Sequence, residues 1–219
     1  MVRLISSTGR SAAKGMELEV ETLVVGPLST NCYVVSSGGE ALIVDPGWDA
    51  ERVLRAVSGM KVVGIVATHG HFDHVGAVEE LKRRLGVEFV IHRLDEGLLD
   101  VAVNHGERFG LRFERPRPDR FIEEGERIEL GGVEIEVIHT PGHSPGSVCL
   151  RGAFTLFSGD TLFMGSVGRT DIFGGSFEQL ERSIRDKLYV LDDATVVYPG
   201  HGPATTIGFE KRHNPFVRP

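Results

Sequence analysis

Short apolar runs recur along the chain and are separated by glycine, proline and polar residues. Runs of this kind, bounded by Gly-Pro and Gly-Gly turns, predict β-strands. Several are almost continuously apolar, which indicates strands that are covered on both faces. The predicted strands are residues 18–25, 31–36, 40–44, 61–67, 87–91, 120–124, 127–130, 133–139, 147–151, 154–158 and 195–198.

Helical patterns lie between some of these strands. Residues 75–85 have apolar side chains at the spacing of one helix face, and Asp49 is suited to cap a short helix around 53–57. Ser176 and Gln179 form the pattern of a capping box, which predicts a further helix beginning there. Strands that alternate with helices in this way predict the α/β class.

The chain shows no internal repeat and no linker between folded units. We therefore predict a single domain over residues 16–219, preceded by a flexible N-terminal extension over residues 1–15, which are polar and aperiodic. Residues 94–103 have helical character. Residues 112–120 are charged and contain two prolines, so we expect a loop there that flanks an active site.

Composition excludes several classes of protein. The chain has 219 residues, of which 41% are hydrophobic and 25% charged, as in ordinary globular domains. A net charge of −7 without a long basic run argues against nucleic acid as a partner. No apolar stretch reaches the roughly 18 residues of a membrane span, and residues 1–15 lack the apolar core of a signal peptide.

The two cysteines, Cys32 and Cys149, are far apart and have no CxxC partner. This usage is typical of reduced thiols in a cytosolic protein. We therefore expect a cytoplasmic protein. No membrane or nucleic-acid partner is expected, and the protein is predicted to be a monomer or a homodimer.

The densest chemistry follows the predicted strand 61–67, in the sequence Thr-His-Gly-His-Phe-Asp-His. Three histidines and one carboxylate, namely His69, His71, Asp73 and His74, fall within six positions. One such residue alone is usually an ordinary core or surface residue. Burial of all four without a cation would be costly, and imidazole with carboxylate suits zinc, iron or manganese better than calcium or magnesium. The sequence therefore predicts a metal site.

Three further segments repeat one design, in which a predicted strand enters a glycine-containing turn that carries a ligand-type residue. The residues are His143 in Pro-Gly-His, Asp160 in Ser-Gly-Asp and His201 in Pro-Gly-His. Glycine beside each residue permits close backbone approach. Any one of them alone would be read as a turn residue, but their recurrence points to the same metal site.

This series, H-x-H-x-D-H followed by His143, Asp160 and His201, resembles the motifs of the metallo-β-lactamase-fold superfamily over nearly the whole of residues 17–219. The segments 159–163, 168–171 and 200–216 resemble the small bacterial and archaeal glyoxalase II-like hydrolases, which are similar to hydroxyacylglutathione hydrolases. The resemblance implies a four-layer αβ/βα sandwich with metals at one edge between the two sheets.

The same resemblance implies two divalent metal ions, with zinc expected first and iron or manganese as alternatives. It implies that one metal is held by His69, His71 and His143, the other by Asp73, His74 and His201, and that Asp160 bridges them. Asp73 and Asp160 are expected to be the catalytic carboxylates.

The implied reaction is hydrolysis of S-2-hydroxyacylglutathione or a related small thioester by a metal-bound hydroxide. A thiolate leaves readily, so no strong general acid is needed. Larger hydroxyacylglutathione hydrolases have a helical C-terminal domain that helps to bind glutathione. Only 18 residues follow His201, so we expect that domain to be missing and glutathione to be held less tightly.

A second activity is compatible with the motifs. Persulfide dioxygenases share the scaffold and the Gly-Arg-Thr-Asp segment, and use a single iron bound by the counterparts of His69, His143 and Asp160. The Gly-His-Gly-Pro-Ala-Thr-Thr segment at residues 200–206 favours the hydrolase.

Four further residues are expected to lie around the predicted centre: Arg169, Phe163, Tyr198 and Asp45. Arg169 is expected either to bind a substrate carboxylate or to fix its loop through an ion pair with Asp171. Phe163 and Tyr198 are expected to line the substrate pocket or to belong to the core. Asp45 either orients a ligating imidazole or is a turn residue. The remaining histidines match no ligand position and are expected to be structural or exposed: His92, His105, His139 and His213.

Overall fold

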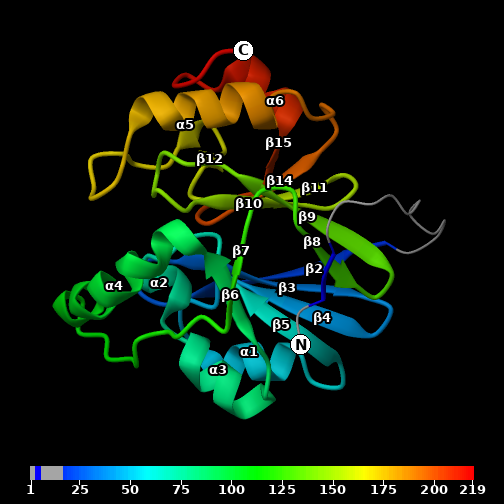
Figure 1. Cartoon of the computed structure of the whole chain (residues 1–219). Helices are drawn as coiled ribbons and strands as arrows, with labels where there is room; N and C mark the ends of the chain where they lie inside the picture. Colours follow the sequence, from blue (N-terminus) through cyan, green and yellow to red (C-terminus); the bar gives the residue numbers. More distant parts are fainter. Residues whose placement is uncertain (1–2, 6–16) are drawn as a thin grey trace.

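Two β-sheets pack face to face, and helices cover the outer face of each, giving four layers (Figure 1). The structure is a computed structural model that describes residues 3–5 and 17–219. The first sheet has the order β2 (Glu19–Val25), β3 (Thr30–Ser37), β4 (Glu40–Val44), β5 (Lys61–Val66), β6 (Phe89–His92) and β7 (Arg120–Ile122). The second has the order β1 (Leu4–Ile5), β8 (Arg127–Leu130), β9 (Val133–His139), β10 (Val148–Arg151), β11 (Thr155–Gly159), β14 (Val196–Pro199) and β15 (Thr205–Thr206).

The helices divide between the two outer layers (Figure 1). On the first sheet lie α1 (Ala50–Ala56), α2 (Phe72–Val75), α3 (Val78–Leu85) and α4 (Glu96–Arg108), the last preceded by the 3-10 turn Arg93–Asp95. On the second lie α5 (Phe177–Ser183), continued by the π-helical turn Ile184–Leu188, and α6 (Ile207–His213). The small hairpin β12 (Leu162–Phe163) and β13 (Ser166–Val167) follows β11. The predicted four-layer αβ/βα sandwich is confirmed.

Three apolar clusters fill the spaces between the four layers. Because neighbouring side chains of a strand point to opposite faces, β4 contributes to two of them. Ala41 and Ile43 pack towards the helices, and Leu42 and Val44 pack between the sheets. All four are fully buried, which confirms that such strands are covered on both faces.

Parallel pairing brings the loops of interest to one edge. Strands β4 and β5 are parallel and their last residues, Val44 and Val66, are paired. In the second sheet β11 and β14 are parallel, with Gly159 paired to Pro199. Parallel strands end at the same edge of a sheet, so the loops after β4 and β5 lie side by side, as do those after β11 and β14.

The observed helices and strands differ from the predicted ones in several places. The helix predicted over 75–85 begins later, as α3 at Val78, and the short helix α2 ends at Val75 before it. Between them, Gly76 approaches the Gly47 carbonyl so closely that a Cβ would lie 2.4 Å from it. Helix α4 runs on to Arg108, so more of this region is helical than predicted. Helix α6 and strand β15 were not predicted.

Of the two predicted helix caps, Ser176 caps its helix through its side chain and Asp49 does not. Ser176 caps α5, since its hydroxyl accepts a hydrogen bond from the Gln179 amide at 3.3 Å. Asp49 occupies the N-cap position of α1, but its carboxylate accepts from the Gly26 amide instead of from the helix.

The predicted extension over residues 1–15 falls mostly outside the described residues. Within it, Leu4 and Ile5 form β1 and pair antiparallel with Ile128 and Arg127 of β8. Among the described residues no helix is both long enough and apolar enough to cross a membrane.

Candidate metal centre

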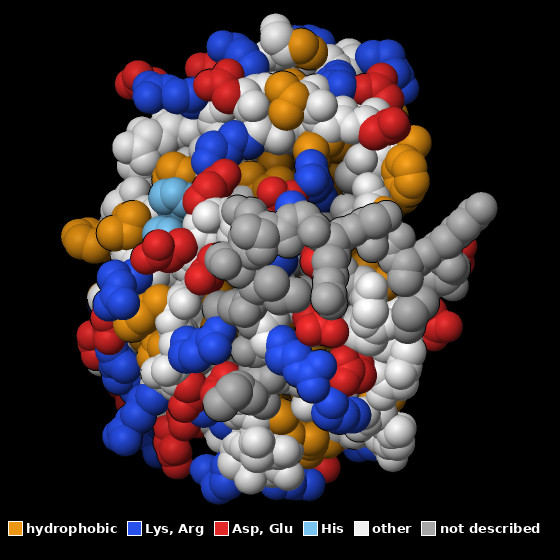
Figure 2. Space-filling model, turned by 45° about the vertical axis from the view of Figure 1, so that its right-hand side comes forward, with side chains coloured by type: hydrophobic (Ala, Val, Ile, Leu, Met, Phe, Trp, Pro, Cys, Tyr) orange, Lys and Arg blue, Asp and Glu red, His pale blue; other side chains and the backbone are white. Residues whose placement is uncertain are grey.

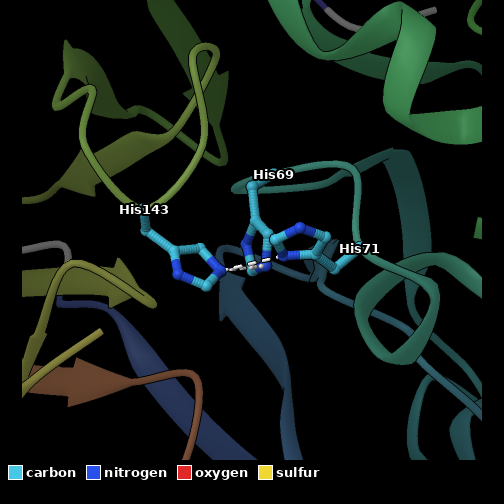
Figure 3. A group of neighbouring side chains, drawn as sticks. All are labelled: His69, His71 and His143. Carbon is cyan, nitrogen blue, oxygen red and sulfur yellow. Dashed lines mark hydrogen bonds between the residues drawn. The ribbon is translucent and has the colours of Figure 1, made fainter. Parts of the chain in front are cut away.

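Three histidine rings converge between the ends of the two sheets (Figure 3). His69 and His71 come from the loop after β5, and His143 comes from the turn after β9. His143 Nε2 lies 2.9 Å from His71 Nδ1 and 3.3 Å from His69 Nε2. A tetrahedral zinc with Zn–N bonds of roughly 2.0–2.1 Å holds its nitrogen ligands about 3.3 Å apart, so these three atoms are suitably placed around one cation.

The protonation of these rings suits the same role. Burial, together with the surrounding histidines, lowers the pKa of His69 well below its ordinary value and that of His71 to about 3. Both imidazoles are therefore neutral near pH 7. A neutral imidazole has the free lone pair that a metal ligand requires.

A second group of ligand-type atoms adjoins the first. Asp73 and His74 lie on α2, at the end of the same loop, and His201 follows β14. Asp73 Oδ2 is 3.3 Å from His201 Nε2 and 3.5 Å from His74 Nε2. These three atoms also lie within 4.8 Å of one another, and so form a second candidate site.

Asp160, directly after β11, lies between the two groups. Its Oδ2 is 3.6 Å from His143 Nε2 in the first group and 3.7 Å from His201 Nε2 in the second. Its Oδ1 is 3.5 Å from His74 Nε2. Gly200 makes this approach possible, because a Cβ there would lie 2.2 Å from Asp160 Oδ1.

Two buried polar atoms of this cluster have no hydrogen-bond partner among the described residues. They are His74 Nε2 and Asp160 Oδ1. Buried polar atoms are nearly always paired, so these two atoms require an explanation. A divalent cation between the imidazole nitrogen and the carboxylate would satisfy both atoms, and the donor set therefore fits a metal.

The electrostatics of the second group also require positive charge. Burial lowers the pKa of His74, but the carboxylates of Asp73, Asp160 and Asp45 outweigh it and raise this pKa to about 10. Burial likewise raises the pKa of Asp73, but the charge of His74 and the hydrogen bond with His201 outweigh it and lower that pKa. Three carboxylates around one buried imidazole are an environment that a cation stabilises.

Asp45, the predicted orienting residue, is buried beneath His74. Its carboxylate accepts hydrogen bonds from the Thr68 amide at 2.6 Å and the Thr68 hydroxyl at 2.7 Å. Asp45 Oδ2 also lies 3.0 Å from His74 Nδ1. This contact fixes the ring so that the other nitrogen, Nε2, faces the second group.

Sequence reasoning missed two buried residues that hold the ligand loops. Asp95 accepts hydrogen bonds from the Gly70 amide, the Ser144 hydroxyl and the Gly146 amide. Asn31 donates its amide protons to the carbonyls of Pro199 and Gly202 on either side of His201. No local pattern marks either residue, because their partners are distant in sequence.

The residues predicted to bind substrate have different surroundings. Arg169 lines the cavity over the cluster, and its guanidinium forms a bidentate ion pair with Asp171 at 2.8 and 2.9 Å. Its backbone carbonyl contacts His143 Nδ1 at 2.8 Å. Phe163 lines the same cavity and meets the His201 ring edge-on.

Tyr198 is not brought to that cavity; its ring packs between the sheets against Tyr33 and Phe157. His105, which matched no ligand position, does line the cavity wall. His92 and His139 stack on each other with ring centroids 4.3 Å apart.

The last of the predicted structural residues lie away from the cavity lining or are buried. His213 is exposed at the end of α6. Cys32 and Cys149 are both buried free thiols.

A family pattern, described as Metallo-beta-lactamase superfamily, matches residues 25–201. The chain therefore belongs to this superfamily. It is similar to the hydroxyacylglutathione hydrolase GloC of Haemophilus influenzae, with 39% identity over 91% of this chain and 98% of the relative. It is also similar to the probable metallo-hydrolase YqgX of Bacillus subtilis, with 37% identity over 88% and 94% of the two chains.

Solved structures show the same fold. The B3 metallo-beta-lactamase BLEG-1 has 39% identity and a TM-score of 0.84, covering 91% of this chain and 99% of its own. TTHA1623, solved in a di-iron-bound form, has 41% identity and a TM-score of 0.83, covering 90% and 100%. ETHE1 from Myxococcus xanthus has 27% identity and a TM-score of 0.76, covering 90% and 83%.

Proposed function

We propose that the protein is a metal-dependent hydrolase of the metallo-beta-lactamase superfamily and that it cleaves small thioesters in the manner of glyoxalase II. The observation that carries this proposal is the pair of three-residue groups with Asp160 between them. The likeness to a hydroxyacylglutathione hydrolase over nearly the full length of both chains supports the same class of substrate.

The ligand sets follow from the two groups. His69, His71 and His143 would hold one divalent ion, Asp73, His74 and His201 the other, and Asp160 would contact both. Bound there, such ions supply Lewis-acid polarisation of a carbonyl oxygen and lower the pKa of water. Zinc suits these ligands, as do iron and manganese, and the di-iron form of TTHA1623 supports iron as an alternative.

The chain's own groups would position the reactants. Thr30 donates a hydrogen bond to Asp73 Oδ2 at 2.9 Å, which would hold this carboxylate in place beside His74 and His201. Asp45 holds the His74 ring in place through Nδ1. The cavity above the cluster has a volume of about 580 Å³, a size typical of sites for small molecules. The thiolate leaves without a proton, so no general acid is assigned.

A second activity, persulfide dioxygenation at a single iron, is supported by one contact. Asp160 Oδ2 lies 3.6 Å from His143 Nε2, which lies 3.3 Å from His69 Nε2. These three side chains could hold one iron without the second group. We rank this activity second because Asp73, His74 and His201 form a complete second group next to these three side chains.

One assay distinguishes the two activities. The purified protein, analysed for metal in the same sample, is offered S-lactoylglutathione and glutathione persulfide while thiol release and oxygen uptake are followed. We expect thiol release from the thioester without oxygen uptake. Oxygen uptake with persulfide and no thioester cleavage would overturn the hydrolase proposal. A β-lactam offered in parallel tests the activity named for BLEG-1.

A further inference from the structure

Three of the apolar side chains that line the cavity above the candidate metal centre are also exposed to solvent. Leu28 comes from the turn between β2 and β3, Phe109 from the end of α4, and Phe173 from the loop before α5. Their exposed fractions are 38%, 55% and 80%. Three separate segments thus place an apolar side chain in solvent at one opening. We refer to Leu28, Phe109 and Phe173 as the collar.

The inner walls continue the same chemistry. Leu98 and Val101 of α4 line one side, and Phe72 stacks against the collar residue Phe109 with ring centroids 5.1 Å apart. Phe163, from the β12–β13 hairpin, meets the His201 ring edge-on. The path from solvent to the ligand atoms is therefore mainly apolar. On the face shown in Figure 2, acidic and basic side chains are intermixed and the hydrophobic side chains are scattered among them.

Charged groups are few in this cavity apart from the ligand atoms. The guanidinium of Arg169 is already paired with Asp171. Arg108 stands exposed at the end of α4, and no ion pair to it is found among the described residues. A cation at the rim suits an anionic group on the outer part of a substrate. The part between that group and the thioester would lie against apolar walls.

Such walls discriminate against polar chains. Moving an amide or hydroxyl group from water to an apolar surface without a new partner costs free energy, whereas moving a hydrocarbon chain there is favourable. Exposed phenylalanines at the opening are themselves stabilised when such a chain covers them. The collar and its inner walls therefore select for apolar substituents close to the reacting carbonyl.

We propose that the collar binds a hydrocarbon chain of the substrate, so that the preferred thioesters carry several apolar carbons next to the thioester group instead of the short, hydroxylated lactoyl group. This inference rests on the proposed thioesterase function. The chain could belong to the acyl part or to the thiol part, since both adjoin the reacting carbonyl, and the test separates these two cases.

The first experiment measures kcat/KM of the metal-loaded protein on two thioester series. In one, acyl groups from acetyl to octanoyl are joined to N-acetylcysteamine; in the other, acetyl is joined to thiols from ethanethiol to octanethiol. Full burial of one methylene can raise kcat/KM about fourfold. In at least one series we therefore expect kcat/KM to rise roughly two- to fourfold with each of the first few methylenes. S-lactoylglutathione is measured alongside.

The outcomes separate this inference from the proposed function. Cleavage of S-lactoylglutathione with no rise in either series would overturn the collar inference and leave the hydrolase standing. Absence of cleavage for every thioester would overturn both. A rise in only one series supports the inference and identifies the side of the thioester that the collar binds.

A second experiment assigns the preference to the collar. If the acyl series shows the rise, Phe173→Ala should reduce the octanoyl-to-acetyl ratio of kcat/KM at least fivefold. If the thiol series shows it, the same variant should reduce the octanethiol-to-ethanethiol ratio at least fivefold. Phe173→Leu should retain most of the ratio. Phe154→Ala is the matched control, because Phe154 is 61% exposed but lies in the β10–β11 turn and does not line the cavity. Equal ratios in all variants would contradict the assignment.

Binding provides a readout that does not depend on turnover. S-alkylglutathiones from methyl to octyl are thioethers that cannot be hydrolysed, and their affinities can be measured by calorimetry. If the collar binds the acyl side, the affinity should rise with chain length, with a negative heat-capacity change. Phe173→Ala should flatten this rise, whereas Phe154→Ala should not. Affinity independent of chain length, together with a flat acyl series, would exclude the acyl side.

Discussion

Asp95 Oδ2 accepts a hydrogen bond from the Gly70 amide at 2.9 Å, so that the residue before α4 holds the short backbone link between His69 and His71. The same carboxylate accepts from the Ser144 hydroxyl at 2.7 Å and the Gly146 amide at 2.6 Å, in the turn that carries His143. One buried carboxylate thus ties together the two loops of the first histidine group.

Asp95→Asn should therefore weaken metal binding. An asparagine presents an NH2 group where the carboxylate accepts from three donors, so at least one bond is lost, at a cost of about 1–3 kcal/mol. Substitutions of residues that hold metal ligands in place typically lower the affinity for metal 10–100-fold. We expect a loss in that range for the first group. A competition titration with a chromogenic chelator measures it. Asp100→Asn is the control, because Asp100 lies exposed on α4, the helix that follows Asp95. Equal affinities in both variants would contradict the prediction.

Asp160→Asn tests the residue between the groups. A neutral amide cannot balance two cations, so we expect a retained fold, lower metal content and at least a roughly 10²-fold loss in kcat, as for removal of a major electrostatic contribution. Circular dichroism, metal analysis and turnover are measured on the same preparation. Turnover close to that of the unmodified protein with both metals retained would be inconsistent with a bridging role.

Metal removal should change both composition and stability. Seven ligand-type side chains predict about two zinc, iron or manganese ions per chain in a fully active preparation. A ligand that binds only the folded state raises its stability, so a chelator should lower Tm and metal should restore it. Full activity with one iron per chain would instead favour the dioxygenase.

The Arg169–Asp171 ion pair yields a prediction with two variants. If Arg169 also contacts substrate, Arg169→Ala should raise KM more than it lowers kcat, whereas Asp171→Asn, which frees the guanidinium, should leave KM unchanged or lower it. If the pair serves only to fix the loop, both variants should have the same effect. Steady-state kinetics with an anionic thioester separates the two cases.

His92 should make stability depend on pH. Burial, together with the neighbouring His139, lowers the pKa of His92 to about 4 in the folded protein, against an ordinary value of 6.5. Between these values the unfolded chain binds more protons, so the free energy of unfolding should fall as pH decreases from 6.5 to about 4, by about 2 kcal/mol in total. His92→Gln should remove this part of the slope in urea titrations. His213→Gln, at an exposed histidine, should not.

The strands and the ligand series were predictable because each depends on neighbouring residues. Asp95 and Asn31 were not, since Gly146 is 51 residues from the first and Pro199 is 168 residues from the second. Tyr198 illustrates a different limit. Its position at the end of a strand was visible in the sequence, but the face on which its ring lies depends on how the two sheets pack.

Each ligand group takes side chains from both halves of the sandwich, and this has a consequence for biosynthesis. A nascent chain that has not reached His143 already carries His69, His71, Asp73 and His74 in one loop, yet neither three-residue group is complete. The first group becomes complete only with His143, and the second only with His201. Either group of three ligand-type side chains is therefore complete only after the two sheets have docked, and binding of a cation by all three is expected only from that step on.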